Sequence, residues 1–406
     1  MKMVMRMQKS PFKKAEPILQ RLKEHGYQAF FVGGCVRDLL LNRPIGDIDI
    51  ATSAKPWQVQ DIFEKVLPVG MEHGTVIVRH QHESYEVTTF RLDGTYSDFR
   101  HPDQVEFIQT IEQDLQRRDF TINAMAMDID GNMIDPFGGN MDLKRKRIRT
   151  VGKASERFHE DPLRMIRALR FASQLGFAIE ETTQTSMNKQ QEQIKDLAVE
   201  RITSEVTKLF AGSFVNNGLH YLRETQIYQQ LPVISEYPDI ISQIPSSLRP
   251  LQSFAEVIAL FHVLEPSITI ESWVRQWKCS NKQKQEAVQL TNAWYHYKAY
   301  GLDRWLTYRL DSMFFPGFVR VGKNLDEHVT LSTDELEKLR NCLPIRSLPE
   351  LAVNGNDLQK LFPNKRKGPW IKHFLGVLEK KVVYGELTNN KNELKEWITW
   401  NPPEIN

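Results

Sequence analysis

Two aspartates separated by one residue are the strongest chemical signal in this chain. They lie in the stretch Gly46-Asp47-Ile48-Asp49-Ile50, where acidic and branched apolar residues alternate. In a β-strand, residues i and i+2 point to the same face, so Asp47 and Asp49 should project together while the isoleucines enter a core. Adjacent carboxylates repel each other unless a cation lies between them, and such hard oxygen ligands suit Mg²⁺. Strand alternation alone also produces such pairs, so an ordinary polar strand face is the structural alternative.

A glycine pair upstream of these aspartates is a natural place for a phosphate group. The apolar residues 29–32 predict a buried strand that ends at Gly33 and Gly34. A glycine turn lets backbone N–H groups approach phosphate oxygens closely. A helix is predicted to begin just after the turn, with Arg37 adding positive charge near its start and Asp38 pairing or capping locally. A phosphate-binding turn beside a magnesium-binding carboxylate pair predicts nucleotidyl transfer with two Mg²⁺ ions.

A third carboxylate lies on a neighbouring predicted strand. Residues 85–90 alternate as a strand does and follow a second strand-like run at 76–78. Glu86 falls on the polar face of this strand. It either completes the metal site or occupies a polar position that alternation supplies anyway.

Two adjacent arginines precede an apolar segment. Arg117 and Arg118 place two cations side by side, and a triphosphate is the natural counter-ion for such a pair. A surface position explains Arg117 more readily than Arg118. Asn123, within the apolar segment, offers an amide for a ribose hydroxyl or for the backbone.

A helix predicted to begin near Asp161-Pro162 carries the residues expected to choose the base. Aspartate before proline is a favourable helix start, and Arg164, Arg167 and Arg170 then recur every three residues along one side. Cytosine and adenine both present an amine donor beside a ring-nitrogen acceptor, which suits Asp161 and Arg164. Guanine and uracil present the opposite order, and burying mismatched polar groups costs on the order of 10⁴-fold in rate. The pair predicts acceptance of CTP and ATP, and an i,i+3 salt bridge worth about 0.3–0.5 kcal/mol is the structural alternative.

Length and composition describe a globular protein with more than one domain. The chain has 406 residues, of which 41% are hydrophobic and 26% charged. No run of ~18 uncharged apolar residues predicts a membrane span, and the start of the chain lacks the apolar core of a secretory signal. Cys35, Cys279 and Cys342 are scattered, which favours reduced thiols in the cytoplasm over a disulfide framework or a zinc site.

Charge is nearly balanced overall but unevenly placed along the chain. The formal net charge is +2, yet basic residues cluster between 144 and 170 and again between 365 and 381. Such patches favour a polyanion bound at defined places, although a solvated face explains the second cluster equally well. Up to about residue 145 the pattern is mixed α/β, and after residue 162 helical periods dominate. The predicted fold is an α/β head with a mixed sheet, followed by an elongated all-α array.

Together the motifs resemble the class II tRNA nucleotidyltransferases, the CCA-adding enzymes of the DNA polymerase β superfamily. The resemblance rests on residues 33–49, 85–100, 117–126 and 152–177. The resemblance is strong over about the first 210 residues and includes the family's helix-stabilising motif at 199–205. Beyond these residues it is weaker, with similarity to the family's tail at 353–358 and 368–370. The resemblance implies four parts: a catalytic head (1–145), a base-recognising neck (146–213), a tRNA-binding body (214–305) and a tail that binds the tRNA acceptor arm (306–406).

The resemblance also implies roles for individual residues. Asp47 and Asp49 would bind the metal ions, and Asp161 and Arg164 would read the base. The remaining nucleotide-binding residues would be Gly33, Gly34, Arg37, Arg118, Asn123, Arg167 and Arg170. A flexible loop is implied at 91–100, where small and charged residues suit a mobile lever, namely Arg91, Asp93, Gly94, Tyr96, Asp98 and Arg100.

The activity implied is the template-independent addition of C, C and A to the 3′ end of tRNA, with CTP and ATP as substrates. The helical part would hold the tRNA by its backbone and A-form shape. A homodimer is a further expectation from the family, whereas the expectation of a cytoplasmic location rests on the cysteines. Three alternatives remain at this point: an enzyme that adds only A, a bacterial poly(A) polymerase, and an RNA-binding protein without catalysis.

Overall fold

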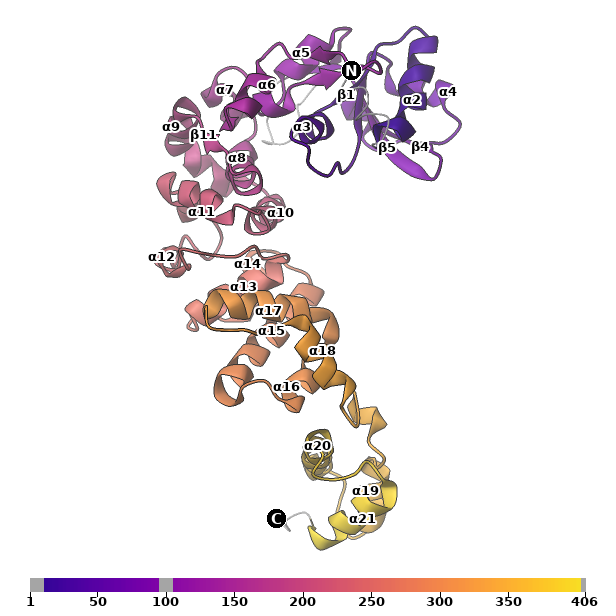
Figure 1. Cartoon of the computed structure of the whole chain (residues 1–406), viewed down its shortest axis with the longest axis vertical. Coiled ribbons are helices and arrows are strands. Elements are labelled where there is room, and N and C mark those ends of the chain that lie inside the picture. The colour runs from indigo at the N-terminus through magenta and orange to yellow at the C-terminus, as the bar shows by residue number, and fades with distance from the viewer. Residues whose placement is uncertain (1–10, 95–104, 403–406) are drawn as a thin grey trace. The chain divides into compact units, whose positions relative to one another are not determined.

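The structure, a computed structural model, describes residues 11–94 and 105–402. It divides into two compact units, Met1–Ile241 (unit 1) and Ser242–Asn406 (unit 2). Unit 1 combines a sheet with helices, whereas the described part of unit 2 is helical (Figure 1). The predicted fold class, an α/β head followed by helices, is therefore confirmed. The finer division into four domains stays a prediction.

A mixed sheet forms the centre of the α/β part of unit 1. Its strand order is β3-β4-β5-β2-β1-β8-β9, in which β2 and β5 are parallel and the other neighbours are antiparallel. These strands are β1 (Ala29–Val32), β2 (Asp49–Thr52), β3 (Val66–Leu67), β4 (Thr75–His80), β5 (Glu83–Thr89), β8 (Ala126–Met127) and β9 (Met133–Ile134). Two short pairs lie outside this sheet: β6 (Arg91–Asp93) with β7 (Val105–Phe107), and β10 (Arg147–Ile148) with β11 (Ala178–Ile179).

The strand register places the acidic residues next to the glycine turn. Asp49 is paired with Val32 in β1 and with Glu86 in β5. The predicted strand over 46–50 starts too early, because β2 begins at Asp49 and Asp47 precedes it. The reason is that β1 ends at Val32 and the chain turns at Gly33, so β1 offers no partner residue beyond Asp49.

Short helices surround the sheet. They are α2 (Phe12–Glu24), α3 (Gly34–Leu40), α4 (Pro56–Ile62), α5 (Ile111–Gln116) and α6 (Gly139–Lys144), with 3₁₀ turns η1 (Met71–His73) and η2 (Thr121–Asn123). The apolar residues of α2 recur at helical spacing, and one face of the helix is buried. α2 and α4 pack against each other beside the sheet, whereas α3 follows β1 directly (Figure 1). The sheet thereby holds the glycine turn and the acidic residues on a rigid support.

Helix α8 is the central helix of the rest of unit 1. The helices here are α7 (Ala154–Glu160), α8 (Leu163–Leu175), α9 (Glu181–Gln190), α10 (Val199–Phe210) and α11 (Val215–Glu224), with 3₁₀ turns η3 (Gln191–Asp196) and η4 (Ile227–Gln230). The short helix α12 (Ile240–Gln243) begins in unit 1 and ends in unit 2. α8 packs against both α10 and α11. Gly218 of α11 permits the close contact between α11 and α8, because a Cβ at this position would lie 2.6 Å from the Cβ of Ser173 in α8. α8 is buried along most of its length, so its arginines are held in fixed positions.

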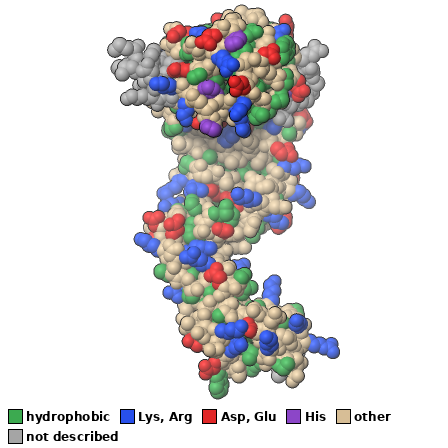
Figure 2. Space-filling view, turned by 90° about the vertical axis from the view of Figure 1, so that its right-hand side faces the viewer, with side chains coloured by type: hydrophobic (Ala, Val, Ile, Leu, Met, Phe, Trp, Pro, Cys, Tyr) green, Lys and Arg blue, Asp and Glu red, His purple; other side chains and the backbone are tan. Residues whose placement is uncertain are grey.

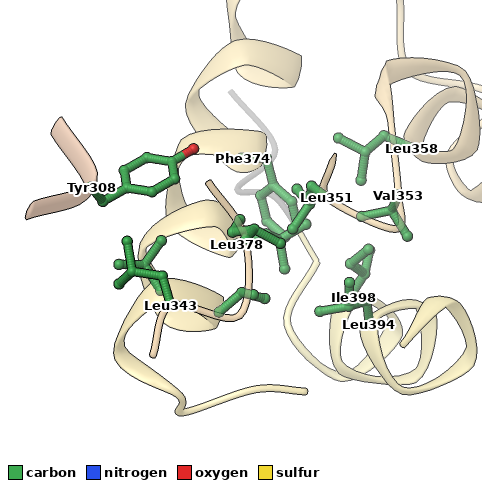
Figure 3. Close-up of a cluster of buried hydrophobic side chains, with 12 residues drawn as sticks. Tyr308, Leu343, Leu351, Val353, Leu358, Phe374, Leu378, Leu394 and Ile398 are labelled. Atoms are coloured by element: carbon green, nitrogen blue, oxygen red, sulfur yellow. The ribbon is translucent and has the colours of Figure 1, made fainter. Parts of the chain in front are cut away.

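Unit 2 contains two groups of helices. α13 (Phe254–Leu264), α15 (Asn281–Tyr300) and α17 (Phe315–Leu325) pack together, and α14 (Ile270–Gln276) joins them. The others are α16 (Arg304–Arg309), α18 (Thr333–Asn341), α19 (Gly355–Leu361), α20 (Pro369–Tyr384) and α21 (Lys391–Trp400), with 3₁₀ turns η5 (Ser312–Phe314) and η6 (Leu348–Glu350). A cluster of buried apolar side chains that includes Leu358, Phe374, Leu378 and Leu394 holds α19, α20 and α21 together (Figure 3). Among the described residues, no helix is long and apolar enough to cross a membrane.

Candidate active site

One cleft of about 700 Å³ in unit 1 is lined mainly by charged and polar side chains. Its acidic residues are Asp47, Asp49, Glu86, Asp119 and Asp161. Its basic residues are Arg37, Arg91, Arg117, Arg118, Arg164, Arg167, Arg170, Arg201 and Lys208. Gly33, Gly34 and Asn123 also line it. The structure thus brings together all residues for which the sequence predicted a catalytic or nucleotide-binding role, although the roles themselves stay predictions.

The predicted flexible loop is only partly described. Arg91 and Asp93 belong to β6, and Gly94 follows that strand. Arg91 also lines the cleft. Tyr96, Asp98 and Arg100 lie outside the described residues, so the function proposed for the loop stays a prediction.

Asp49 lies at the acidic end of the cleft and is only partly accessible. Burial, together with the neighbouring charges of Glu86 and Asp47, raises the pKa of Asp49 to about 6, while the charge of Arg118 opposes this shift. Such a shift means that negative charge at this point is costly without a cation. A bound metal ion would relieve that cost.

The acidic residues offer an incomplete set of metal ligands. Asp47, Asp49 and Glu86 form no ion pair among the described residues, so they are available for a cation. No group of three acidic, histidine or cysteine side chains within the described ranges forms a complete metal cage. Mg²⁺ usually takes only one or two carboxylates and completes its shell with water and substrate phosphate oxygens. The residues present therefore fit Mg²⁺ bound together with a nucleotide, and Glu86 as a third ligand stays a prediction.

The glycine turn lies against one of the predicted phosphate-binding arginines. Gly33 has a φ of 73°, and a Cβ there would lie 2.9 Å from Nη1 of Arg118 and 3.8 Å from a carboxylate oxygen of Asp49. Only glycine combines this backbone conformation with so close an approach. Arg118 is thereby held between the turn and the acidic residues, where a triphosphate and its metal ion would meet.

Arg37 and Asn123 are linked inside the cleft. Arg37 donates to Asn123 Oδ1 at 2.8 Å and forms a two-point pair with Asp38 at 3.0 and 2.9 Å, so Asp38 pairs locally, as predicted. Asn123 Nδ2 in turn donates to Asp119 at 3.1 Å. The amide of Asn123 therefore orients side chains of the cleft, and a bond to ribose would compete with these contacts.

Asp161 and Arg164 line the same cleft but pair with different residues. Asp161 Oδ2 accepts from Arg201 at 2.9 Å, and its Oδ1 accepts from the backbone N–H of Leu163 at 3.1 Å. Arg164 donates instead to Glu160 Oε2 at 2.7 Å. The i,i+3 salt bridge considered above is therefore absent from the ion pairs of the described residues. Asp161 and Arg164 are therefore each oriented by other residues and do not pair with each other, and their role in reading a base stays a prediction.

The two remaining arginines of α8 are held by buried carboxylates. Arg167 donates to Asp119 Oδ2 at 2.9 and 2.6 Å, and Arg170 donates to Glu205 at 2.5 Å. Both guanidinium groups, together with that of Arg37, lie within 6 Å of the ring of Phe171, at 5.7, 4.0 and 5.2 Å from its centroid. Burial opposes ionisation of Asp119, but the charges of Arg167 and Arg164 and the hydrogen bond of Asn123 keep its pKa below its usual value. The arginines of the cleft are thus fixed in position while remaining charged.

Sequence reasoning assigned no role to several residues that hold the site together. They are Asp114, Asp119, Glu160, Phe171, Arg201, Glu205 and Lys208. Glu160, Arg201 and Glu205 lie within stretches that carry the family resemblance. Their positions in the sequence gave no sign of a role, which only their ion pairs in the structure indicate. Asp114 offered a local signal, because an acidic residue three and four positions before two arginines faces them on a helix.

Three family models match the chain. They are "Poly A polymerase head domain" over residues 29–149, "Probable RNA and SrmB- binding site of polymerase A" over 176–237, and "tRNA nucleotidyltransferase domain 2 putative" over 250–398. Between them they cover most of both units.

Relatives over the full length give a narrower assignment. The chain is 50% identical over 397 residues to a CCA-adding enzyme of Oceanobacillus iheyensis, covering 98% of this chain and 99% of that one. It is 41% identical over 393 residues to a CCA-adding enzyme of Bacillus cytotoxicus, covering 95% and 98%. The crystal structure of the Bacillus stearothermophilus CCA-adding enzyme in complex with CTP matches with a TM-score of 0.86 and 38% identity, covering 96% and 97%.

These relatives favour CCA addition over A-only addition, poly(A) synthesis and RNA binding without catalysis. The motifs predicted from the sequence, the cleft that gathers them and the full-length similarity agree with one another. The chain belongs to the CCA-adding enzymes, the class II tRNA nucleotidyltransferases.

Proposed function

We propose that the cleft of unit 1 binds CTP and ATP in turn and transfers their nucleotidyl groups to the 3′ end of tRNA, adding C, C and A. The observation that carries this proposal is the meeting of Asp47 and Asp49 with Arg118, Asp161 and Arg164 at one cleft. These residues would supply, at one cleft, the three parts that template-independent transfer requires: a metal site, a triphosphate site and a base-selecting pair. The CTP complex of the Bacillus stearothermophilus relative supports CTP as a ligand here.

Two Mg²⁺ ions held by Asp47 and Asp49 fit the acidic end of the cleft. When bound, they would supply Lewis-acid activation of the attacking hydroxyl and charge neutralisation at the pyrophosphate. Gly33 lets the guanidinium group of Arg118 lie against the turn, and Arg118 and Arg37 provide positive charge for the phosphates. Because these arginines are already oriented by protein partners, little reorganisation is needed when the triphosphate arrives.

Base selection is assigned to Asp161 and Arg164. Each carboxylate oxygen of Asp161 has one protein donor, so each retains a lone pair for the exocyclic amine of cytosine or adenine. Arg164 is 8% exposed and is oriented by Glu160 and by the carbonyl oxygen of Arg117 at 3.3 Å. A carbonyl of uracil or guanine facing Asp161 would leave acceptors opposed, which disfavours UTP and GTP.

Unit 2 is proposed to bind the tRNA backbone. Arg309, Arg346 and Lys372 line a cleft of about 400 Å³. Their side chains form no ion pair among the described residues, unlike most arginines of unit 1. Figure 2 shows basic side chains on the surface of the C-terminal helices. Unpaired cations around a cleft favour phosphate groups, and RNA supplies these in a row.

Location and assembly remain predictions. The three cysteines are free, with Cys35 buried, which agrees with a reducing compartment such as the cytoplasm. A homodimer is tested directly by light scattering of the purified protein.

The decisive experiment uses tRNA that lacks its 3′ CCA. With CTP alone the protein should add two residues of C, and with CTP and ATP it should complete CCA and stop. An enzyme that adds only A would incorporate no C, and a poly(A) polymerase would extend the RNA with ATP alone. Asp47→Ala and Asp49→Ala should each abolish transfer while leaving tRNA affinity nearly unchanged, since metal ligands act on the reacting groups. Loss of tRNA binding in these variants would instead indicate a structural role.

A further inference from the structure

Asp114 is a fully buried carboxylate that lies next to the active-site cleft without lining it. It belongs to α5, and its exposed fraction is 0%. A buried charge is costly unless it is paired and hydrogen-bonded. The partners of Asp114 therefore indicate why the chain has a carboxylate here.

Both oxygens of Asp114 are used by the adjacent arginine pair. Oδ1 accepts from Arg117 Nε at 3.0 Å, and Oδ2 accepts from Arg118 Nη2 at 3.2 Å. Arg117 Nη2 also lies 2.9 Å from Oδ1. One carboxylate thus holds two neighbouring guanidinium groups, which would otherwise repel each other.

A third contact connects Asp114 to the strand that leads into the predicted loop. The backbone N–H of Arg91, the first residue of β6, lies 3.4 Å from Asp114 Oδ1. Asp114 is therefore the point where β6, Arg117 and Arg118 meet.

The two arginines carry the effect of Asp114 into the cleft. Arg118 lies against Gly33 and its charge acts on Asp49, so its position affects the predicted phosphate and metal sites. The carbonyl oxygen of Arg117 accepts from Arg164 Nη2 at 3.3 Å, which connects the same α5 segment to the base-selecting pair. A change at Asp114 would reach the nucleotide without any direct contact.

We propose that Asp114 is a positioning residue for the nucleotide: it holds Arg117 and Arg118 in the orientation that receives the triphosphate and ties them to β6. This inference rests on the proposed function of the cleft. Burial alone would raise the pKa of Asp114, but the charges of Arg117 and Arg118 and their hydrogen bonds lower it, so the carboxylate is ionised in the neutral range. The alternative is that Asp114 only stabilises the fold.

Asp142 provides a matched control for that alternative. It too is 0% exposed and holds two arginines, with Arg147 at 2.6 Å and Arg149 at 2.8 Å. Neither Asp142 nor its two arginines lines the cleft. Substitution of Asp142 should therefore have a similar structural cost without a direct effect on nucleotide binding.

The test compares Asp114→Asn with Asp142→Asn, both of which keep the shape of the side chain and remove its charge. Steady-state rates are measured with CTP on tRNA lacking CCA and with ATP on tRNA ending in CC. Asp114→Asn should raise the KM for CTP and for ATP by about tenfold, the loss expected for one charge-assisted hydrogen bond, and leave the KM for tRNA within about twofold. Asp142→Asn should lower the midpoint of thermal unfolding but leave all KM values within about twofold.

A double-mutant cycle shows whether Asp114 acts through the arginines. In an Arg118→Lys background, Asp114→Asn should raise the KM for nucleotide by a clearly smaller factor than it does in the natural chain. The reason is that the group through which Asp114 acts has already been changed. If Asp114→Asn yields too little folded protein, Asp114→Glu is measured in its place. It keeps the charge but lengthens the side chain, so it should displace both guanidinium groups and still raise the KM for CTP and ATP.

Two results would overturn the inference. One is a folded Asp114→Asn or Asp114→Glu variant with unchanged KM for both nucleotides. The other is an equal rise of the KM for tRNA and for nucleotide, which would indicate a general loss of structure. If the natural chain itself incorporates no C, the proposed function fails instead, so the two failures are distinguishable.

Discussion

Arg201 Nη2 lies 2.9 Å from Asp161 Oδ2, and this ion pair joins the start of α8 to α10. Neither residue is widely exposed, with side-chain exposures of 20% and 15%. The carboxylate predicted to read the base is therefore oriented from a different helix. If Asp161 reads the base as predicted, base selection would depend on the packing of α8 against α10 in addition to the motif itself.

Asp161→Ala and Arg164→Ala should relax base choice before they abolish transfer. Each removes one of the two groups that distinguish cytosine and adenine from uracil and guanine. Incorporation of all four nucleotides into tRNA lacking CCA measures the effect. Selectivity equal to that of the natural chain in both variants would refute the assignment of these residues.

Arg201→Ala should weaken base selection without removing a group that contacts the base. The preference for CTP over UTP is expected to fall by about tenfold, because the loss of a charge-assisted contact frees Asp161 to adopt other orientations. In an Asp161→Ala background the same substitution should have little further effect on the ratio. A fully additive effect would show that Arg201 acts elsewhere.

Asp49→Asn should stabilise the metal-free protein at neutral and alkaline pH. The folded-state pKa of Asp49 is raised to about 6, chiefly by burial, so the fold favours the protonated carboxyl and is destabilised once Asp49 ionises. For a group whose pKa is raised on folding, stabilisation is present below the unfolded value and is lost as pH rises through the folded value. Ionisation of Asp49 should thus lower the free energy of unfolding of the natural chain by on the order of 2–3 kcal/mol between about pH 4 and pH 7.

The measurement is thermal unfolding in EDTA as a function of pH. Above pH 6 the midpoint of thermal unfolding should be higher for Asp49→Asn than for the natural chain, and this difference should disappear near pH 4. Added Mg²⁺ should raise the midpoint of the natural chain more than that of Asp49→Asn. Equal responses of the two proteins to Mg²⁺ would contradict the predicted metal site.

Arg309→Gln, Arg346→Gln and Lys372→Gln should each weaken tRNA binding and reduce its dependence on salt. A cation that contacts a phosphate contributes close to one unit to the slope of log K against log salt. Lys298→Gln is the matched control, because Lys298 is an exposed lysine of unit 2 that is already paired with Asp326 at 3.2 Å. Affinity and salt slope equal to the control in all three variants would remove this cleft from the tRNA-binding surface.

Gly218→Ala should destabilise unit 1 by about 1–3 kcal/mol, because the added Cβ would overlap Ser173 of α8 at 2.6 Å. Gly376→Ala is expected to have the opposite effect on stability. It lies within α20 and nothing lies within 4 Å of its added Cβ, so alanine should stabilise the helix by roughly 0.5–1 kcal/mol. Chemical denaturation of both variants tests the pair, and a neutral Gly218→Ala would mean that α8 and α11 separate easily.

The family, the fold class and the main acidic and basic residues of the cleft could be predicted from the amino-acid sequence. These follow from short-range patterns: Asp47 and Asp49 alternate with apolar residues, Gly33 and Gly34 end an apolar run, and Asp161 precedes a proline. Each of these patterns spans only a few residues, so local backbone geometry is enough to indicate how its side chains are placed.

The residues that orient these predicted site residues became evident from the folded structure alone. Asp119 holds Arg167 across 48 positions of the chain, and Glu205 holds Arg170 across 35. Nothing in the local sequence states that these residues meet, because their distance depends on how α8 packs against its neighbours. The same holds for the start of β2 at Asp49, which is set by where β1 ends and not by the alternation of residues. Charges in a buried cleft need partners, and folding brings those partners from distant parts of the chain.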